Sequence, residues 1–282
     1  MNLSKDFKKL RNIYRNRALL KSTRELPPEA FAVFFRKWNR RGDNWPVDVE
    51  FDRHRQVFEV RDISPAGRRI HVSRASRVPL YKDGVENRIK FLWRQYLADS
   101  VEVGPGDVVL DIGANVGEFS MGAEALGATA ISFEPDPQEF RSLQCNLERS
   151  KPFNLALWKE SGVMTFYSKN ASGDSSLIEM EGYSEKIDVQ AETLDAFYER
   201  ELAGVPVKLV KLEAEGAEPE IIEGGGAALR QARFIAVDAG PERGFDQNNT
   251  VVQVLDGLRR LGFELVRFGN DRHILLFENQ AA

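Results

Sequence analysis

Apolar residues recur along this chain with two different periods, and the change of period divides it in two. Between residues 47 and 72 they tend to recur at every second position in short segments, which predicts an antiparallel meander. From about residue 108 onward, short continuous apolar runs alternate with segments of helical spacing. This alternation predicts an α/β fold with a doubly wound, mostly parallel sheet. We therefore expect an accessory region over residues 1–80 and a larger α/β domain over residues 81–282.

The individual runs predict the elements of both parts. For the accessory region we expect a basic helix, an aromatic helix carrying Phe31, Phe34, Phe35 and Trp38, and strands at 47–51, 57–60 and 70–72. The expected helices of the second part lie at 84–97, from 117 onward, and at 138–149, 219–223 and 251–261. Its expected strands are 108–112, 130–133, 153–157, 163–167, 207–213, 234–238, 263–268 and 273–277. We expect the last two strands to be an antiparallel pair.

The run VVLDIGANVGEFS, residues 108–120, has the form of a ligand-binding turn. A continuously apolar strand leads into a turn with two glycines, and a helix follows. Glycine permits backbone angles and a close ligand approach that a side chain would obstruct. We interpret the turn as a nucleoside-binding site, and its candidate residues are Asp111, Gly113, Ala114, Asn115 and Gly117.

Two residues of this turn indicate which ligand it suits. A dinucleotide fingerprint needs G-x-G-x-x-G, because its second glycine lets the backbone approach a pyrophosphate on the helix N-terminus. Here Asn115 replaces the second glycine and Glu118 the third, and a carboxylate in the first helical turn would repel a pyrophosphate. A nicotinamide oxidoreductase is thereby disfavoured. S-adenosylmethionine fits better, because it combines a nucleoside and a single carboxylate with a cation that tolerates nearby acids.

A second acid supports a nucleoside ligand. Glu134 ends the next predicted strand, roughly 20 residues after the glycine turn, where Rossmann-like folds place the carboxylate that binds a ribose diol. Pro135 and Asp136 follow it and complete the candidate cofactor-binding set. We expect Glu134 to face the ribose and Asp111 to face the methionine amine. Glycine turns after a strand also occur without such a ligand, so the prediction of a nucleoside site depends on the correctly spaced acid.

A further polar group follows the strand predicted at 207–213, in the sequence VKLVKLEAEGAE. Side-chain alternation directs Lys211 and Glu213 to the same face, and a buried ammonium requires an acidic partner. Glu215 follows, and Asp238 ends the next strand, so these residues converge on the edge of the sheet that carries the glycine turn. Two interpretations stay open: a catalytic group that orients an acceptor hydroxyl, and an architectural ion pair.

Four ionisable residues are candidates for a general base, namely Glu213, Glu215, Asp238 and His273. His273 precedes an apolar strand, and we interpret it as a residue of the strand edge. A divalent metal held by the three carboxylates stays open, because such ligands suit magnesium. No ligand-spacing motif requires a metal.

Composition and charge restrict the class of protein. The chain has 282 residues, 42% of them hydrophobic, and its single cysteine excludes an intrachain disulfide. No apolar run approaches the ~20 residues of a membrane span, and the N-terminal residues lack the apolar core of a signal peptide, so we expect neither feature. We expect a cytoplasmic protein with a small-molecule or glycan partner and no nucleic-acid partner.

The net charge of −4 conceals a basic N-terminus. Residues 1–41 contain twelve Lys and Arg but only three acids, and the apolar positions of residues 3–14 have helical spacing. Such a helix would suit weak contact with an anionic membrane or an acidic glycan. We favour packing on the domain or on a second subunit of a homo-oligomer, because basic helix faces are commonly just solvated.

Four motifs in this order resemble the FkbM family of S-adenosylmethionine-dependent methyltransferases: VVLDIGANVGEFS, ISFEPDPQEFRSLQCNL, VMTFYS with GDSSLI, and VKLVKLEAEGAEPEIIEGG. The resemblance covers about residues 104–277. It implies a class I methyltransferase fold, S-adenosylmethionine as cofactor, and O-methylation of a hydroxyl on a sugar, glycan or secondary metabolite. The alternative is a catalytically silent module of the same fold that serves in binding or assembly.

The chain departs from the family in one motif. The family often has K-I-D-V-E-G where this chain reads KLEAEG, residues 211–216. The longer Glu213 would reach further than the aspartate that it replaces. Residues before about 81 match the family poorly, and we expect the accessory region to determine the acceptor.

Overall fold

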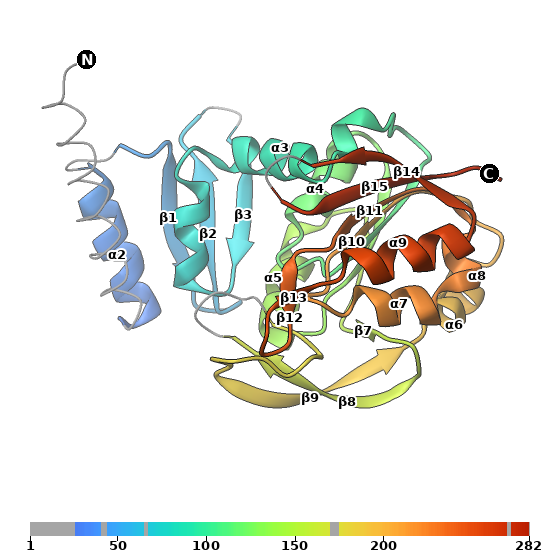
Figure 1. Cartoon of the computed structure of the whole chain (residues 1–282). Helices are drawn as coiled ribbons and strands as arrows, with labels where there is room; N and C mark the ends of the chain where they lie inside the picture. The colour runs from blue at the N-terminus through green and yellow to red at the C-terminus, as the bar shows by residue number, and fades with distance from the viewer. Residues whose placement is uncertain (1–25, 41–43, 65–66, 170–174, 270–271, 282) are drawn as a thin grey trace, which may run out of the picture. The chain divides into compact units, whose positions relative to one another are not determined.

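A computed structural model describes residues 26–40, 44–64, 67–169, 175–269 and 272–281. The chain forms two compact units, Met1–Val85 and Glu86–Ala282 (Figure 1). The predicted basic helix lies outside the described residues, so its contacts stay a prediction. No helix among the described residues is long and apolar enough to cross a membrane.

The first unit joins one helix to a three-stranded sheet. Helix α2 is Pro28–Trp38, and the antiparallel strands are β1 (Val47–Asp52), β2 (Val57–Asp62) and β3 (Arg69–Val72), in the order β1-β2-β3. Phe31 and Phe35 are buried, and the Phe31 ring lies edge-on to Phe58 with centroids 5.4 Å apart. A 3-10 helix, Ala75–Tyr81, follows the meander. The aromatic helix and the meander predicted for this region are confirmed.

The second unit is built on a seven-stranded sheet in the order β14-β15-β11-β10-β4-β5-β6. Figure 1 labels four of these strands, β14, β15, β11 and β10. Its strands are β4 (Val108–Ile112), β5 (Thr129–Phe133), β6 (Lys151–Phe153), β10 (Val207–Leu212), β11 (Ala232–Asp238), β14 (Phe263–Phe268) and β15 (Ile274–Asn279). Strands β4, β5, β6, β10 and β11 are parallel, whereas β15 runs antiparallel to both β11 and β14. The mostly parallel sheet and its final antiparallel pair are as predicted.

Helices cover both faces of this sheet. They are α3 (Val85–Gln95), α4 (Glu118–Ala125), α5 (Pro137–Asn146), α6 (Leu194–Glu201), α7 (Glu218–Gly224), α8 (Gly226–Leu229) and α9 (Val251–Arg260). Side-chain alternation along β4 sends Leu110 and Ile112 into one core with α6, α7, α8 and α9, and Val109 into another core with α3 and α4. The doubly wound architecture is therefore confirmed.

The strand predicted at 153–157 is wrong, because the chain leaves the main sheet in its middle. β6 ends at Phe153, and β7 (Ala156–Leu157) belongs to a separate sheet of order β7-β9-β8. Between them, the Asn154 side-chain amide donates to the Glu134 and Pro135 carbonyls at 2.8 and 3.0 Å. These bonds hold the turn that separates the two strands.

The smaller sheet contains a strand that the pattern did not predict. β8 (Gly162–Ser168) was expected, whereas β9 (Glu185–Glu192) was not. β9 is polar along most of its length, and only Val189 and Ala191 are buried. A short pair, β12 (Pro241–Arg243) and β13 (Asn248–Asn249), follows β11.

The turn after β4 depends on a glycine with no room for a side chain. Gly113 has φ +72°, and a Cβ there would lie 1.8 Å from the Glu213 carbonyl oxygen. We expect Gly113→Ala to lower the free energy of unfolding by about 2–6 kcal/mol, the sum of the costs of a left-handed backbone and an overpacked contact. Chemical denaturation measures this loss. The matched control is Gly162→Ala, where a Cβ meets nothing within 4 Å and stability should hardly change. Equal stability of the two variants would contradict the close approach.

Candidate active site

The glycine turn is held to the neighbouring strand by its backbone. The Gly113 and Ala114 amides donate to the Phe133 carbonyl at 3.1 and 2.9 Å. Asn115 and Gly117 both have positive φ, +52° and +90°, so the chain doubles back before α4 begins. The turn therefore places its predicted cofactor residues at the carboxyl ends of β4 and β5.

Glu134 joins the turn to the loop after β5. One carboxylate oxygen accepts from the Asn115 amide and the other from the Asp136 amide, both at 2.8 Å. Burial raises the pKa of Glu134 to about 8, although both amide bonds favour the charged form. Asp136 in turn caps α5 by accepting from the Gln138 amide, and it accepts from the Ser168 hydroxyl at 3.1 Å. Three of the predicted cofactor residues, Asn115, Glu134 and Asp136, therefore form one hydrogen-bonded group.

Asp111 and Lys211 form an ion pair inside the sheet. They are register partners on β4 and β10, and Lys211 Nζ lies 3.1 Å from Asp111 Oδ1. Asp111 Oδ2 accepts from the Ser120 amide and hydroxyl at 3.1 and 2.6 Å. The Asp111 side chain has no exposed surface, and that of Lys211 is 3% exposed. The structure thus places Asp111 within the domain, and its expected contact with the cofactor amine stays a prediction.

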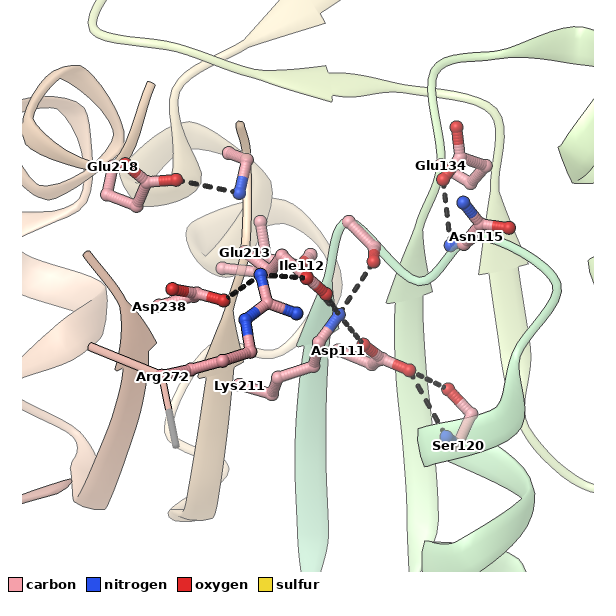
Figure 2. A network of polar contacts seen from close by, with 12 residues as sticks. Asp111, Ile112, Asn115, Ser120, Glu134, Lys211, Glu213, Glu218, Asp238 and Arg272 are labelled. Carbon is pink, nitrogen blue, oxygen red and sulfur yellow. Dashed lines mark hydrogen bonds and ion pairs between the residues drawn. The ribbon is translucent and has the colours of Figure 1, made fainter. Parts of the chain in front are cut away.

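The same ammonium makes the predicted contact with Glu213. Lys211 Nζ lies 3.2 Å from Glu213 Oε2 and donates to the Gly113 carbonyl at 2.6 Å (Figure 2). It also lies 5.3 Å from the centre of the Tyr96 ring. Burial alone would lower the pKa of Lys211, but the charges of Asp111 and Glu213 outweigh burial and raise it. Lys211 is therefore a charged link between the glycine turn and the end of β10.

Arg272 extends this network across the end of β11. Its guanidinium lies 3.5 Å from Glu213 Oε1, contacts Asp238, and donates to Glu242 at 2.9 Å (Figure 2 shows the first two contacts). Asp238 also accepts from the Gly240 amide at 3.1 Å. The network therefore runs from Asp111 through Lys211, Glu213 and Arg272 to two further carboxylates.

Four carboxylates and two cations make this network formally anionic, and the excess charge shifts proton affinities. Burial and then the charge of Glu213 raise the pKa of Asp238. Burial and then the charge of Asp238 raise the pKa of Glu242 to about 8. For Glu213, burial is outweighed by the charges of Lys211 and Arg272, which hold its pKa below the ordinary value.

Solvent exposure divides the predicted catalytic residues. Lys211 and Asp238 are buried and support other residues, whereas the Glu213 side chain is 23% exposed. Glu215 is partly exposed and has φ +51°, and its carbonyl accepts from the Ser176 hydroxyl at 3.0 Å. His273 is exposed immediately before β15, as expected for a strand edge.

The predicted carboxylates do not gather around a metal position. Among the described residues, no group of three or more His, Cys, Asp and Glu side chains is arranged to hold a metal ion. Glu213 and Asp238 instead share Arg272.

Sequence reasoning missed four residues of this network. Ser120 and Glu218 are the last residues of the two motifs, although the pattern predicts no role for them, and Glu242 and Arg272 stand outside both motifs. Glu218 accepts from the Ala214 and Gly216 amides at 2.9 and 3.1 Å. It thereby fixes the loop between β10 and α7. The one local signal for Glu218 is its position at the start of α7, where a carboxylate can accept hydrogen bonds from the preceding backbone amides.

A doubly wound sheet with a glycine turn after one strand and an acid at the end of the next defines an enzyme domain that binds a nucleoside cofactor. Residues 111–265, more than half of the chain, match the methyltransferase FkbM domain, and the chain belongs to this family. The predicted resemblance to this family is confirmed, and the doubly wound sheet agrees with the class I methyltransferase fold that the resemblance implies.

Three characterised proteins are similar to parts of the chain. The 31-O-demethyl-FK506 methyltransferase FkbM of Streptomyces tacrolimicus is 41% identical over 92 residues, 28% of this chain and 35% of that protein. The 2-O-methyltransferase NoeI of Sinorhizobium fredii is 27% identical over 184 residues, 57% of this chain and 74% of that protein. The hexuronic acid methyltransferase AglP of Haloferax volcanii is 24% identical over 184 residues, 64% of this chain and 73% of that protein. The chain thus matches about a third of the length of the first relative.

The residues present fit S-adenosylmethionine. Glu134 offers a carboxylate at the end of β5 beside the glycine turn, which suits a ribose diol. The nearby network carries more carboxylates than cations, and this balance favours a sulfonium. The turn lacks the second and third glycines of the dinucleotide fingerprint, but S-adenosylmethionine has no pyrophosphate that would require them.

The Asp111–Lys211 pair should behave as an anchor of the fold. We expect Lys211→Met to lower the free energy of unfolding by about 3–5 kcal/mol, because it leaves Asp111 buried without its cation. The double variant Asp111→Asn, Lys211→Met should regain at least half of that loss, since the asparagine oxygen can still accept from Ser120. Denaturant titration of Asp111→Asn, Lys211→Met and the double variant, each compared with the wild type, checks this recovery.

A matched control for this test is Lys90→Met. Lys90 pairs with Glu86 on the exposed side of α3 at 3.3 Å, so its loss should leave stability nearly unchanged. If the losses caused by Asp111→Asn and Lys211→Met simply add in the double variant, the two side chains are not an anchoring pair.

Proposed function

We propose that this protein transfers the methyl group of S-adenosylmethionine to a hydroxyl of a sugar, glycan or secondary metabolite. The observation that carries the proposal is the group of three partly exposed charged side chains, Glu213, Glu242 and Arg272, whose charged atoms meet beyond β10 and β11. Such a group offers both donors and acceptors to a hydroxylated substrate. The backbone of Glu213 abuts Gly113, so this group adjoins the proposed cofactor turn.

The names of the similar proteins support this class of acceptor. One is a 2-O-methyltransferase, one a hexuronic acid methyltransferase, and one a methyltransferase of 31-O-demethyl-FK506. In our proposal the glycine turn and Glu134 bind the cofactor, and Glu213 orients the acceptor hydroxyl. Lys211, Asp111 and Asp238 hold these groups in place from inside the domain.

Positioning would supply much of the rate. Methyl transfer requires the attacking oxygen and the methyl carbon to be held about 3–3.5 Å apart and in line with the departing sulfur. A network of buried ion pairs suits this task, because its members cannot reorient freely. Glu215 lies two residues after Glu213 in the loop that Glu218 fixes, and in our proposal this loop shapes the entrance to the acceptor site.

Isotope transfer tests the reaction. We expect the purified protein, given cofactor with a labelled methyl group and a metabolite extract, to produce labelled methyl ethers that mass spectrometry identifies. Glu134→Ala should reduce labelling at low cofactor concentration, because the loss of hydrogen bonds to the ribose weakens binding by about 1–3 kcal/mol. Tight binding of the cofactor with no labelled product from extracts or defined sugars would instead favour a silent binding module. Label found on nitrogen or carbon would contradict the proposed acceptor.

The proton on Glu134 should make cofactor binding depend on pH. With its pKa raised to about 8, Glu134 is mostly protonated at neutral pH, and only the ionised form accepts hydrogen bonds from both ribose hydroxyls. Affinity for S-adenosylhomocysteine should therefore rise with pH and level off above the pKa. Between about pH 8.5 and pH 6.5 we expect a loss on the order of tenfold or more. Isothermal titration calorimetry measures it, and Glu134→Gln should bind weakly with a flat profile. A wild-type profile as flat as that of the variant would remove Glu134 from the ribose site.

A further inference from the structure

We propose that Glu242 is the general base of this site, the carboxylate that receives the proton of the acceptor hydroxyl. The proposal rests on the methyl transfer proposed above and goes beyond it by naming the proton acceptor. Glu242 belongs to β12, outside every motif that the sequence singled out.

Exposure leaves few candidates within the network. Asp111 and Asp238 have no exposed side-chain surface, so neither can touch an acceptor. The side chains of Glu213 and Glu242 are each 23% exposed, and both lie against Arg272. Within the network, the base is therefore one of these two glutamates.

Charge distinguishes the two. Glu213 lies between the cations Lys211 and Arg272, at 3.2 and 3.5 Å, which stabilise its ionised form and make it a weak proton acceptor. Glu242 has Arg272 as its single cationic contact among the described residues, and the acids Asp238, Glu213 and Glu218 face it as well. Its burial and then their repulsion raise the pKa of Glu242 to about 8, close to the value at which a base works best near neutral pH.

The backbone around Glu242 fixes its position. The Glu242 amide donates to the Gly240 carbonyl at 3.0 Å, and the Gly240 amide donates to Asp238 Oδ1 at 3.1 Å. On the other side, Arg243 makes a two-pronged ion pair with Glu220 of α7 at 2.6 and 2.8 Å and donates to the Gly216 carbonyl. Glu242 is thus held between β11 and the loop that follows β10.

The proton has a defined path in this step. The acceptor oxygen forms a bond to the methyl carbon while the carbon–sulfur bond breaks, and its electron pair goes to sulfur, which becomes a neutral thioether. The hydroxyl proton passes to the Glu242 carboxylate and then to water. The positive charge lost from sulfur equals the charge of the proton released, so the step balances without another reactant.

Two substitutions at Glu242 and one matched control test the assignment. Glu242→Gln removes the base and keeps the size of the side chain, and Glu242→Asp keeps a carboxylate on a shorter stem. The control is Glu278→Gln on β15, where a glutamate of 28% exposure pairs with Arg233 at 2.8 Å away from the network. All four proteins are assayed with an acceptor that the wild type methylates.

We expect Glu242→Gln to lower kcat by about 100-fold or more, the usual contribution of a general base, while the Kd of S-adenosylhomocysteine changes less than threefold. Glu242→Asp should recover part of kcat with a displaced pH profile, and Glu278→Gln should match the wild type. Infrared difference spectra of wild type minus Glu242→Gln should show one carboxyl group titrating near pH 8 without any acceptor present.

Three results would overturn the assignment. One is near-wild-type kcat in Glu242→Gln, and another is loss of cofactor binding in parallel with kcat, which indicates an architectural role. The third is the absence of a titrating carboxyl group from the difference spectrum. In each case the wild type still forms methyl ethers, so the proposed function stands. If the wild type methylates no hydroxyl at all, the proposed function fails and the base assignment fails with it.

Discussion

The ion pair between Lys211 and Asp111 is the interaction on which the rest of the site depends. Burying an ammonium is costly, and here its cost is offset by two carboxylates and by the Gly113 carbonyl. Because one ammonium holds both the glycine turn and Glu213, the proposed cofactor and acceptor sides of the site keep a fixed spacing. Ser120 completes the arrangement by satisfying the second oxygen of Asp111.

The pattern of the sequence predicted the elements whose signals are local. The apolar run of β4 and the inward position of Lys211 on β10 follow from strand periodicity alone, and the structure confirms both. β9 was not predicted because only two of its own side chains are buried, so the strand has no apolar run. The break after β6 was not predicted because the Asn154 side chain makes its hydrogen bonds with residues about twenty positions earlier in the chain.

The same distinction between local signals and long-range contacts explains which residues of the site could be predicted. Lys211 and Glu213 stand two residues apart on one strand, so their contact could be predicted, whereas the glycine carbonyl that Lys211 also holds is 98 residues away in sequence. Arg272 depends on topology: antiparallel β15 pairs Ile274 with Asp238, so the residues just before Ile274 extend past the carboxyl end of β11. No local motif marks this arrangement, because it exists only once β15 has inserted between β11 and β14.

The sharing of Arg272 among Glu213, Asp238 and Glu242 has a consequence for how this site tolerates change. A substitution at any one of the three redistributes the guanidinium among the other two, so the effects of separate substitutions will not sum. Sequence drift in a relative should therefore be correlated across these positions, with an altered charge at one matched by an altered charge at another. If these residues contact the acceptor as proposed, a change of acceptor would require concerted replacements rather than single ones.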